Sequence, residues 1–176
     1  MIFFYLIVLA IVISAAYAGY SAAPWVPTKP AQRQLVLDHL TISSNSRVID
    51  LGCGDGSWLF TFAAKYPQIE AIGYDISLLP LIIGQLRKSF SPKLYARVHL
   101  RLGNLWQVDI TQTDVVFIFL MKKAYPRLVT KLATLKPSTL VAVEAWPLPH
   151  IKPHQTITGP NLLPVYIYQG NQFHSL

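Results

Sequence analysis

Cysteine and acidic side chains are scarce in this sequence. One cysteine, Cys53, stands among 176 residues, and 8 Asp and Glu face 15 Lys and Arg, so that the formal net charge is +7. A single cysteine excludes an intramolecular disulfide and fits a reducing compartment. The 5 histidines lack metal-ligand spacing, because His150 and His154 lie in a proline-broken loop without a third ligand nearby, and we predict no metal site. The basic balance suits an anionic membrane face or nucleic acid, and composition does not choose between them.

Charge is absent before Lys29, and residues 2–18 form an almost uninterrupted apolar run. A helix over residues 2–22 would rise about 30 Å, enough to cross the core of a bilayer. The first basic residues, Lys29 and Arg33, follow the run, so the positive-inside rule predicts one membrane span with the rest of the chain in the cytoplasm. A signal peptide cleaved after Ala16-Tyr17-Ala18 is an alternative, but it lacks a basic n-region. A buried core helix is another, but the run is apolar on all faces.

The best-defined motif is Val-Ile-Asp-Leu-Gly-Cys-Gly-Asp-Gly at residues 48–56. It indicates a buried strand, a glycine turn and the start of a helix over residues 57–65. Glycines let the backbone adopt positive φ and approach a ligand closely, and the helix directs its free N–H groups and positive dipole end at the turn. A second strand, residues 69–74, ends at Asp75, about twenty residues past the last glycine. This layout is typical of dinucleotide-binding folds, in which the acid after the second strand binds ribose.

The charges beside this turn argue against a nicotinamide cofactor. Asp50 and Asp55 flank the glycines, and the spacing G-x-G-x-G is tighter than G-x-G-x-x-G. Two carboxylates would repel a pyrophosphate and suit a ligand with an ammonium or sulfonium centre.

Strands and helices alternate through the rest of the chain. Strands are predicted at residues 47–51, 69–74, 99–102, 114–120 and 140–146, helices at 31–40, 57–65, 76–90 and 125–135, and a closing hairpin at 155–158 and 164–168. Alternation implies right-handed crossovers and a doubly wound, mostly parallel sheet of the α/β class, with the ligand at the carboxyl ends of the strands. We divide the chain into a transmembrane anchor (1–22), a proline-rich joint (23–30), whose Trp25 suits the membrane interface, and the α/β domain (31–176).

The glycine motif, with Gly73-Tyr74-Asp75 downstream, resembles the first two motifs of class I S-adenosylmethionine-dependent methyltransferases, which have a Rossmann-like sheet. The N-terminal span followed by Pro24-Trp25-Val26-Pro27-Thr28, Asn104-Leu105-Trp106 and Trp146-Pro147-Leu148-Pro149 narrows the resemblance to the membrane-anchored protein-lysine methyltransferase family. Its mitochondrial members methylate lysines of the ATP synthase c-subunit and the adenine nucleotide translocase, and it has prokaryotic relatives. The resemblance covers about residues 23–168. The chain departs from the family at Asn104, where Asp is usual, and at Trp146, where Phe is usual.

The resemblance implies S-adenosylmethionine as the cofactor and assigns its contacts. The implied cofactor-binding residues are Thr28, Asp50, Gly52, Cys53, Gly54, Asp55, Gly56, Asp75, Ile76, Asn104 and Leu105. Among them Asp50 receives the ammonium group, Asp75 accepts both ribose hydroxyls, and Ile76 and Leu105 enclose the adenine with Asn104 at its edge. Thr28 caps the cofactor's carboxylate, and Cys53 is a small packing residue of the turn rather than a nucleophile.

Methyl transfer depends mainly on positioning and desolvation, because the sulfonium is already activated. A lysine nucleophile must still lose a proton, for which Glu144, late in the fifth strand, is a candidate acid. Trp106 and Trp146 are candidates for an aromatic wall around an ammonium group. Each of the three residues has a structural alternative, as an ordinary polar or packing residue of the sheet.

We therefore predict a membrane-anchored methyltransferase that modifies a lysine of a membrane protein, with its catalytic domain facing the cytoplasm. A methyltransferase for a lipid or quinone headgroup and a non-catalytic S-adenosylmethionine-binding membrane subunit are the alternatives. Methylation of a nucleic-acid base amine is disfavoured, because Phe119-Leu120-Met121-Lys122 stands where Asn-Pro-Pro-Tyr would follow the fourth strand. A nucleic-acid partner is likewise not expected. The basic residues considered for it, which more simply face solvent or anionic lipid, are Lys122, Lys123, Arg127 and Lys131.

Overall fold

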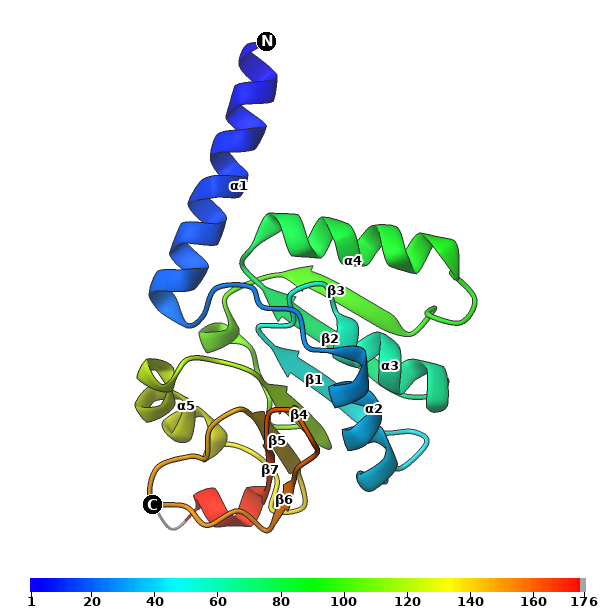
Figure 1. The fold of residues 1–176 in the computed structure, drawn as a ribbon, viewed down its shortest axis with the longest axis vertical. Coiled ribbons are helices and arrows are strands. Elements are labelled where there is room, and N and C mark those ends of the chain that lie inside the picture. Colours follow the sequence, from blue (N-terminus) through cyan, green and yellow to red (C-terminus); the bar gives the residue numbers. More distant parts are fainter. Residues whose placement is uncertain (175–176) are drawn as a thin grey trace.

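A mixed sheet organises the fold in the computed structural model, which describes residues 1–174; residues 175 and 176, the end of the predicted domain, lie outside it. The strands are β1 (Arg47–Leu51), β2 (Glu70–Asp75), β3 (Val98–Leu102), β4 (Val115–Ile118), β5 (Leu140–Glu144), β6 (Gln155–Ile157) and β7 (Val165–Gln169). Their order is β3-β2-β1-β4-β5-β7-β6 (Figure 1). Strands β1 to β5 pair in parallel, and β7 runs antiparallel between β5 and β6. The predicted doubly wound, mostly parallel sheet with a C-terminal hairpin is confirmed.

The sheet separates two apolar layers. The helices are α1 (Ile2–Ser21), α2 (Pro30–His39), α3 (Ser57–Lys65), α4 (Leu78–Phe90) and α5 (Tyr125–Leu132), with 3-10 turns η1 (Leu105–Gln107), η2 (Lys122–Ala124) and η3 (Gly170–Phe173). Helices α2, α3 and α4 cover one face, and α5 covers the other. The central strand β4 is buried at every position, as expected for a parallel strand covered on both faces. On the α3 side, Trp58 stacks on Phe117 of β4 with their ring centroids 4.8 Å apart.

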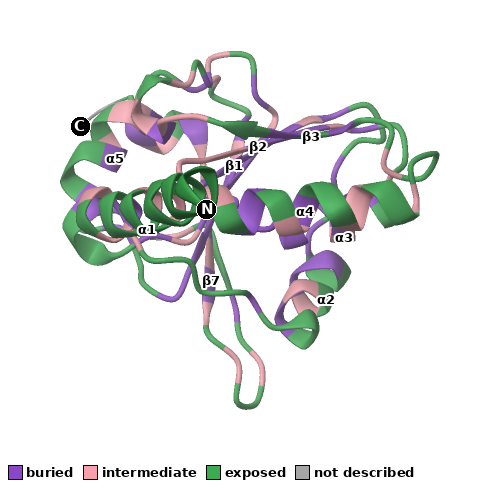
Figure 2. Cartoon of the chain, turned by 90° about the horizontal axis from the view of Figure 1, so that it is seen from above, coloured by how far each residue is buried: buried purple, intermediate pink, exposed green. Residues whose placement is uncertain are grey.

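Helix α1 projects from one edge of the domain (Figure 1). Its side chains are exposed along most of its length, and Ala18 is the buried residue that it contributes (Figure 2). Helix α1 is therefore not part of the domain's own core. By length and composition it could cross a membrane, a property that a signal sequence shares.

Candidate functional site

A cavity of about 270 Å³ lies at the carboxyl ends of the parallel strands, where doubly wound sheets bind their ligands. Three parts of the chain line it. The glycine turn and the end of β2 contribute Asp50, Gly52, Cys53, Gly54, Asp55, Asp75 and Ile76. The segments that follow β3 and β4 contribute Gly103, Asn104, Leu105, Phe119, Leu120 and Met121. The end of α1 and the proline-rich joint contribute Ala18 and every residue from Ser21 to Thr28, and Ser57, Trp58 and Trp146 complete the wall.

The glycine turn has the backbone that its sequence predicts. Gly52, Gly54 and Gly56 have φ values of 85°, 55° and 74°, in the left-handed region that disfavours other residues. A Cβ on Gly54 would lie 2.6 Å from Cδ1 of Trp25, so the absence of a side chain lets the indole pack on the turn. Gly56 is not among the residues that line the cavity. It starts α3 instead, as the residue before Ser57.

Asp75 joins this turn to β2. Its Oδ2 accepts a hydrogen bond from the backbone N–H of Gly54 (2.7 Å), and its Oδ1 accepts one from the N–H of Ser77 (2.7 Å). A carboxylate has about four lone-pair sites, so both oxygens can accept further hydrogen bonds from a ligand in the cavity. The same contacts end β2 and delay α4 until Leu78, two residues after the predicted start.

Asp50 provides the strongest sign of a cationic ligand. The residue is 3% exposed, and within residues 1–174 no hydrogen-bond donor reaches its Oδ2. Burial, reinforced by the negative charge of Asp75, raises the pKa of Asp50 well above its usual value. A buried carboxylate oxygen without a donor is costly, and Asp50 borders the cavity, so a cationic ligand there would offset its charge. The ammonium group of S-adenosylmethionine fits this position in charge and hydrogen-bonding capacity.

Asp55 and Cys53 line the cavity but have partners inside the protein. The hydroxyl of Ser57 lies 2.7 Å from one Asp55 oxygen and 2.8 Å from the other, and the Arg87 guanidinium of α4 lies 3.3 Å away. These contacts hold the turn against α3 and α4. The Cys53 sulfur packs so closely on Gly73 that a Cβ there would lie 2.6 Å from it. Burial also raises the pKa of Cys53, which favours the thiol over a nucleophilic thiolate.

The residues predicted around the adenine all belong to the lining of the cavity. They are Ile76, Asn104 and Leu105, and Leu105 is buried. The Asn104 Oδ1 accepts a hydrogen bond from the backbone N–H of Trp106 (3.0 Å) and thereby caps η1. The amide NH₂ of Asn104 is then the group that is left to donate a hydrogen bond to a ligand.

Of the three residues predicted to act on the substrate, the structure places Trp146 in the cavity wall and the other two outside it. Glu144 is buried behind the cavity wall, where its Oε2 accepts a hydrogen bond from the Thr28 hydroxyl (2.9 Å). Burial raises the pKa of Glu144, while hydrogen bonds from Thr28 and the Trp58 side chain oppose that shift. Trp106 does not line the cavity, and the Arg127 guanidinium lies 4.5 Å from the centre of its ring. Trp146 does line the cavity, with the Lys122 ammonium 5.7 Å from its ring centre.

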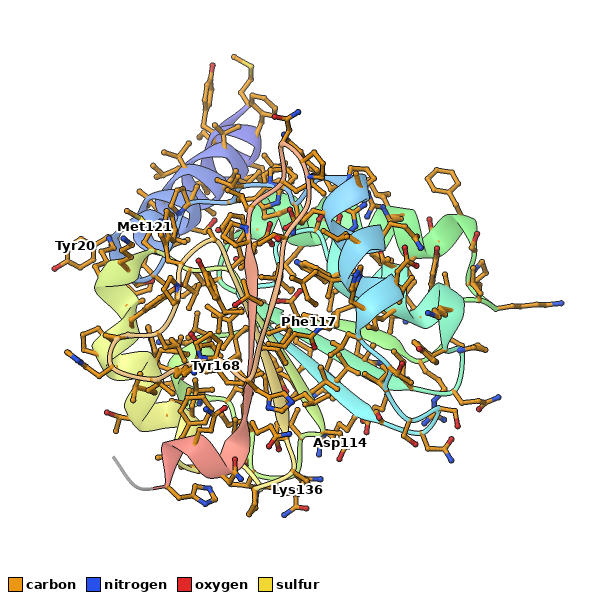
Figure 3. The ribbon with its side chains drawn as sticks, turned by 60° about the horizontal axis from the view of Figure 1, so that its bottom comes forward. Tyr20, Asp114, Phe117, Met121, Lys136 and Tyr168 are labelled. Atoms are coloured by element: carbon orange, nitrogen blue, oxygen red, sulfur yellow. The ribbon has the colours of Figure 1, made fainter. Side chains whose placement is uncertain are left out.

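Helix α1 is tied to this site more closely than its sequence indicates. The Ala22 carbonyl accepts a hydrogen bond from the backbone N–H of Met121 (3.2 Å), and Figure 3 shows Tyr20 and Met121 together at the base of α1. The Lys123 ammonium donates to the carbonyls of Gly19 (2.7 Å) and Tyr20 (2.8 Å), a basic cap on the helix C-terminus. The joint is therefore part of the site rather than a free linker.

Three basic residues predicted to face solvent or lipid have partners of their own. Lys123 caps α1, Arg127 covers Trp106, and the Lys131 ammonium donates to the carbonyls of Trp106 (3.4 Å) and Val108. Trp25 packs on Gly54 and is 37% exposed, and its predicted place at the membrane interface stays a prediction. The feature of the sequence that could have indicated this packing is the position of Trp25 in the Pro-Trp-Val-Pro motif.

Trp25 should report on ligand binding. Because its indole lines the cavity, we expect the tryptophan fluorescence to change when S-adenosylhomocysteine is titrated into the full-length protein. The Trp25→Phe variant should lose the part of that change that Trp25 contributes and keep a smaller change from Trp58 and Trp146, the other two indoles of the wall. The matched control is Trp106→Phe, which removes an indole outside the cavity and should keep the full change. An equal change in both variants would contradict the placement of Trp25.

Comparisons with known proteins agree with this geometry. The model of the ANTKMT methyltransferase domain matches residues 50–155, more than half of the chain. A protein-lysine N-methyltransferase of Saccharolobus islandicus (strain REY15A) is 29% identical over 156 residues, which cover 87% of this chain and 90% of that protein.

Solved structures share the fold. An RNA methyltransferase from Salinibacter ruber, in complex with S-adenosyl-L-homocysteine, superposes with a TM-score of 0.71 at 22% identity over 82% of this chain and 93% of that chain. A SAM-dependent methyltransferase from Thiobacillus denitrificans, also with S-adenosyl-L-homocysteine, gives a TM-score of 0.59 at 23% identity over 72% of this chain and 54% of that chain. The glycine turn, the two acids at the strand ends and the family match lead to one conclusion: the chain belongs to the ANTKMT methyltransferase family and is an S-adenosylmethionine-dependent methyltransferase.

Proposed function

We propose that this enzyme is a membrane-anchored protein-lysine N-methyltransferase that acts on a membrane protein. The observation that carries the proposal is the shared wall of the cavity, since the end of α1 and the joint line it together with the glycine turn. The cavity in which methyl transfer would occur therefore lies beside the base of an apolar helix that is long enough to span a bilayer. The similarity to the Saccharolobus protein-lysine N-methyltransferase supports lysine as the acceptor.

The residues proposed to hold S-adenosylmethionine have distinct tasks. When bound, the cofactor supplies a methyl group on a sulfonium that needs no further activation. Asp50 would accept the ammonium group and Asp75 the ribose hydroxyls, while Gly52 and Gly54 admit the ligand close to the backbone. The remaining residues proposed to contact the cofactor are Ile76, Asn104 and Leu105, which all line the cavity.

Two predicted cofactor contacts have a different task in this proposal. Asp55 is engaged by Ser57 and Arg87, and the Thr28 hydroxyl is engaged by Glu144. Asp55 therefore shapes the turn, and the Glu144–Thr28 pair fixes the joint against β5. We propose Glu144 as a positioning residue, and Trp106 has no role in the proposed site because it lies outside the cavity wall.

The apolar wall of the cavity would favour deprotonation of the substrate lysine. The joint and the end of α1 contribute mostly apolar side chains to the wall, and desolvation lowers the pKa of an ammonium group. Trp146 lines the same wall, where its ring already lies near one lysine ammonium, that of Lys122. An aromatic face of this kind can receive the substrate's ammonium group before it loses its proton.

Anchoring is the second part of the proposal. We propose residues 1–22 as the anchor, 23–30 as a joint fixed to the site, and the following domain as cytoplasmic, since Lys29 and Arg33 follow the apolar run. An anchor raises the effective concentration of the enzyme near targets in the same membrane. We propose that α1 is retained rather than removed as a signal sequence, which the contacts of Lys123 with its last carbonyls and of Met121 with Ala22 support.

The experiment supplies tritiated S-adenosylmethionine to purified full-length protein mixed with membranes from a strain that lacks it. The products are separated by gel electrophoresis and by extraction into organic solvent. We expect label in a protein band that survives lipid extraction. Label in the organic phase would favour a lipid or quinone headgroup as acceptor, and label in neither fraction, with cofactor binding intact, would contradict the proposed acceptor class.

A further inference from the structure

Helix α4, which the structure describes in full, presents an outer face without a charged residue. The exposed positions of this helix are Leu79, Ile82, Gln85, Leu86, Ser89 and Phe90. Phe90 is 85% exposed and Leu86 is 57% exposed. The two charged residues of the helix are turned toward the domain, since Arg87 contacts Asp55 and the Lys88 ammonium donates to the Val98 carbonyl. A helix facing water normally has the opposite pattern, with its charges outside.

The apolar surface continues beyond the helix. A shallow groove between α4 and the edge strand β3 is lined mainly by Leu78, Leu81, Ile82, Leu86, Leu100 and Leu102. Leu102 on β3 is 62% exposed, and Leu94 in the connecting loop is 43% exposed. A contiguous apolar surface of this kind marks an interaction site rather than ordinary solvent-facing protein.

The position of α1 indicates what covers this surface. The Ser14 hydroxyl accepts a hydrogen bond from the backbone N–H of Leu78 (3.2 Å), so α4 begins beside α1. Figure 1 shows α4 lying crosswise to α1 at the edge of the domain from which α1 projects. Seen from above, from the side of the chain's N-terminus, α4 lies in full view beside α1 (Figure 2). Whatever surrounds α1 therefore also meets α4.

The level of α4 along α1 is consistent with both helices entering the same surface of a bilayer. Ser14 lies seven residues before Ser21, the last residue of α1, which corresponds to about 10 Å along the helix axis. If α1 enters the bilayer over its whole length, α4 lies about 10 Å inside the boundary, and interfacial helices bury their apolar face by about 5–10 Å. One exposed basic residue, Lys93, follows in the loop after α4 and suits anionic headgroups.

We propose that the outer face of α4, with Leu94 and Leu102, is a second membrane-contacting surface that lies in the lipid interface beside the anchor. The inference rests on the proposed anchoring by α1. It extends that proposal, because two contacts fix the orientation of the domain where one helix would leave it free to rotate. The cavity, which the base of α1 lines, is thereby held at the lipid–water boundary. Acceptor lysines are then those presented at the membrane surface.

The test measures lipid contact at single positions in the full-length chain. Cysteines introduced by Val8→Cys on α1, Ile82→Cys on α4 and Ser138→Cys at the amino ends of the strands are labelled one at a time with an environment-sensitive fluorophore. The native Cys53 is buried. Each protein is reconstituted into vesicles of phosphatidylcholine and phosphatidylglycerol that carry nitroxide-labelled lipid. We expect a blue shift and strong quenching at positions 8 and 82 and neither at position 138.

A double substitution then removes the apolar contact. Leu86→Glu with Phe90→Glu should reduce quenching at position 82 to the level of position 138 while position 8 stays quenched. The control adds the same charge elsewhere: Asn45→Glu with Ser138→Glu, both exposed and away from α4, should leave position 82 quenched.

The outcomes separate the docking surface from the anchor. Quenching at position 8 with a water-exposed label at position 82 would overturn the docking surface and leave the anchor standing. A blue shift at position 82 without quenching by lipid would show that protein, a second copy or a partner, covers the face, and would also overturn it. Unquenched labels at both positions would remove the anchor and the docking surface together.

Discussion

Asp75→Ala should weaken the binding of S-adenosylmethionine and of S-adenosylhomocysteine by about 100-fold or more. Two hydrogen bonds to a charged acceptor contribute about 1.5–3 kcal/mol each, and a factor of ten in affinity corresponds to about 1.4 kcal/mol. Both ligands should be affected, because they share the ribose that Asp75 is proposed to bind. Isothermal titration calorimetry on the full-length protein measures the effect.

Two further variants keep this prediction separate from misfolding. Asp75 also accepts the N–H groups of Gly54 and Ser77, so Asp75→Asn, which keeps one of the two acceptor oxygens, should retain one of these bonds and weaken binding less than alanine does. The matched control is Asp114→Ala, which removes an acid from the amino ends of the strands, opposite the cavity, where Asp114 pairs with Lys136 at 2.7 Å (Figure 3). It should leave both affinities unchanged. Unchanged affinities in Asp75→Ala would contradict the assignment of the ribose site.

Asp50→Asn should stabilise the ligand-free protein and at the same time weaken cofactor binding. Burying a polar group without a partner costs about 1–3 kcal/mol, so removing the charge should raise Tm by about 4 °C at neutral pH. The affinity for S-adenosylmethionine should fall by about tenfold or more, because the ammonium group loses a charged acceptor. 5′-Methylthioadenosine lacks that ammonium group and should bind both proteins equally.

The pH dependence of stability provides the control for Asp50. Burial raises the pKa of this carboxyl in the folded protein above its unfolded value, so the folded state binds more protons. Stability of the ligand-free wild type should therefore fall as pH rises from the unfolded pKa through the folded one, and Asp50→Asn should lose that component. Cofactor binding should also release protons below the raised pKa, which calorimetry in buffers of different ionisation enthalpy detects. A variant less stable than wild type at neutral pH would contradict this account of Asp50.

Local pattern accounts for the parts of the fold that sequence predicts well. Helix α3 spans Ser57–Lys65, as predicted, because the glycine turn fixes its start and an apolar period defines its extent. Strand β1 likewise has its predicted bounds, Arg47–Leu51. Helix α5 ends at Leu132 rather than at residue 135, a typical uncertainty for a helix end without a clear stop signal.

The sequence could not predict which side chains from distant parts of the chain contact each other. Asp55 is held by Arg87 of α4, and Glu144 of β5 is held by Thr28 of the joint, pairs that no local periodicity encodes. The packing of Trp25 on Gly54 depends on the path of the joint across the strand ends, which α1 and the contacts of Met121 and Lys123 fix. The motif residues were thus identifiable, but the division between ligand-binding and positioning roles required the folded chain.

The most direct test of the central claim is the chemical identity of the methylated residue. Membrane proteins labelled by the full-length enzyme with tritiated S-adenosylmethionine are extracted free of lipid and hydrolysed in acid. The amino acids are then separated by chromatography against methyl-lysine standards. The account predicts that the radioactivity elutes with mono-, di- or trimethyl-lysine and is absent when Asp75→Ala replaces the wild type. Radioactivity in another amino acid, or only in the extracted lipid, would contradict it.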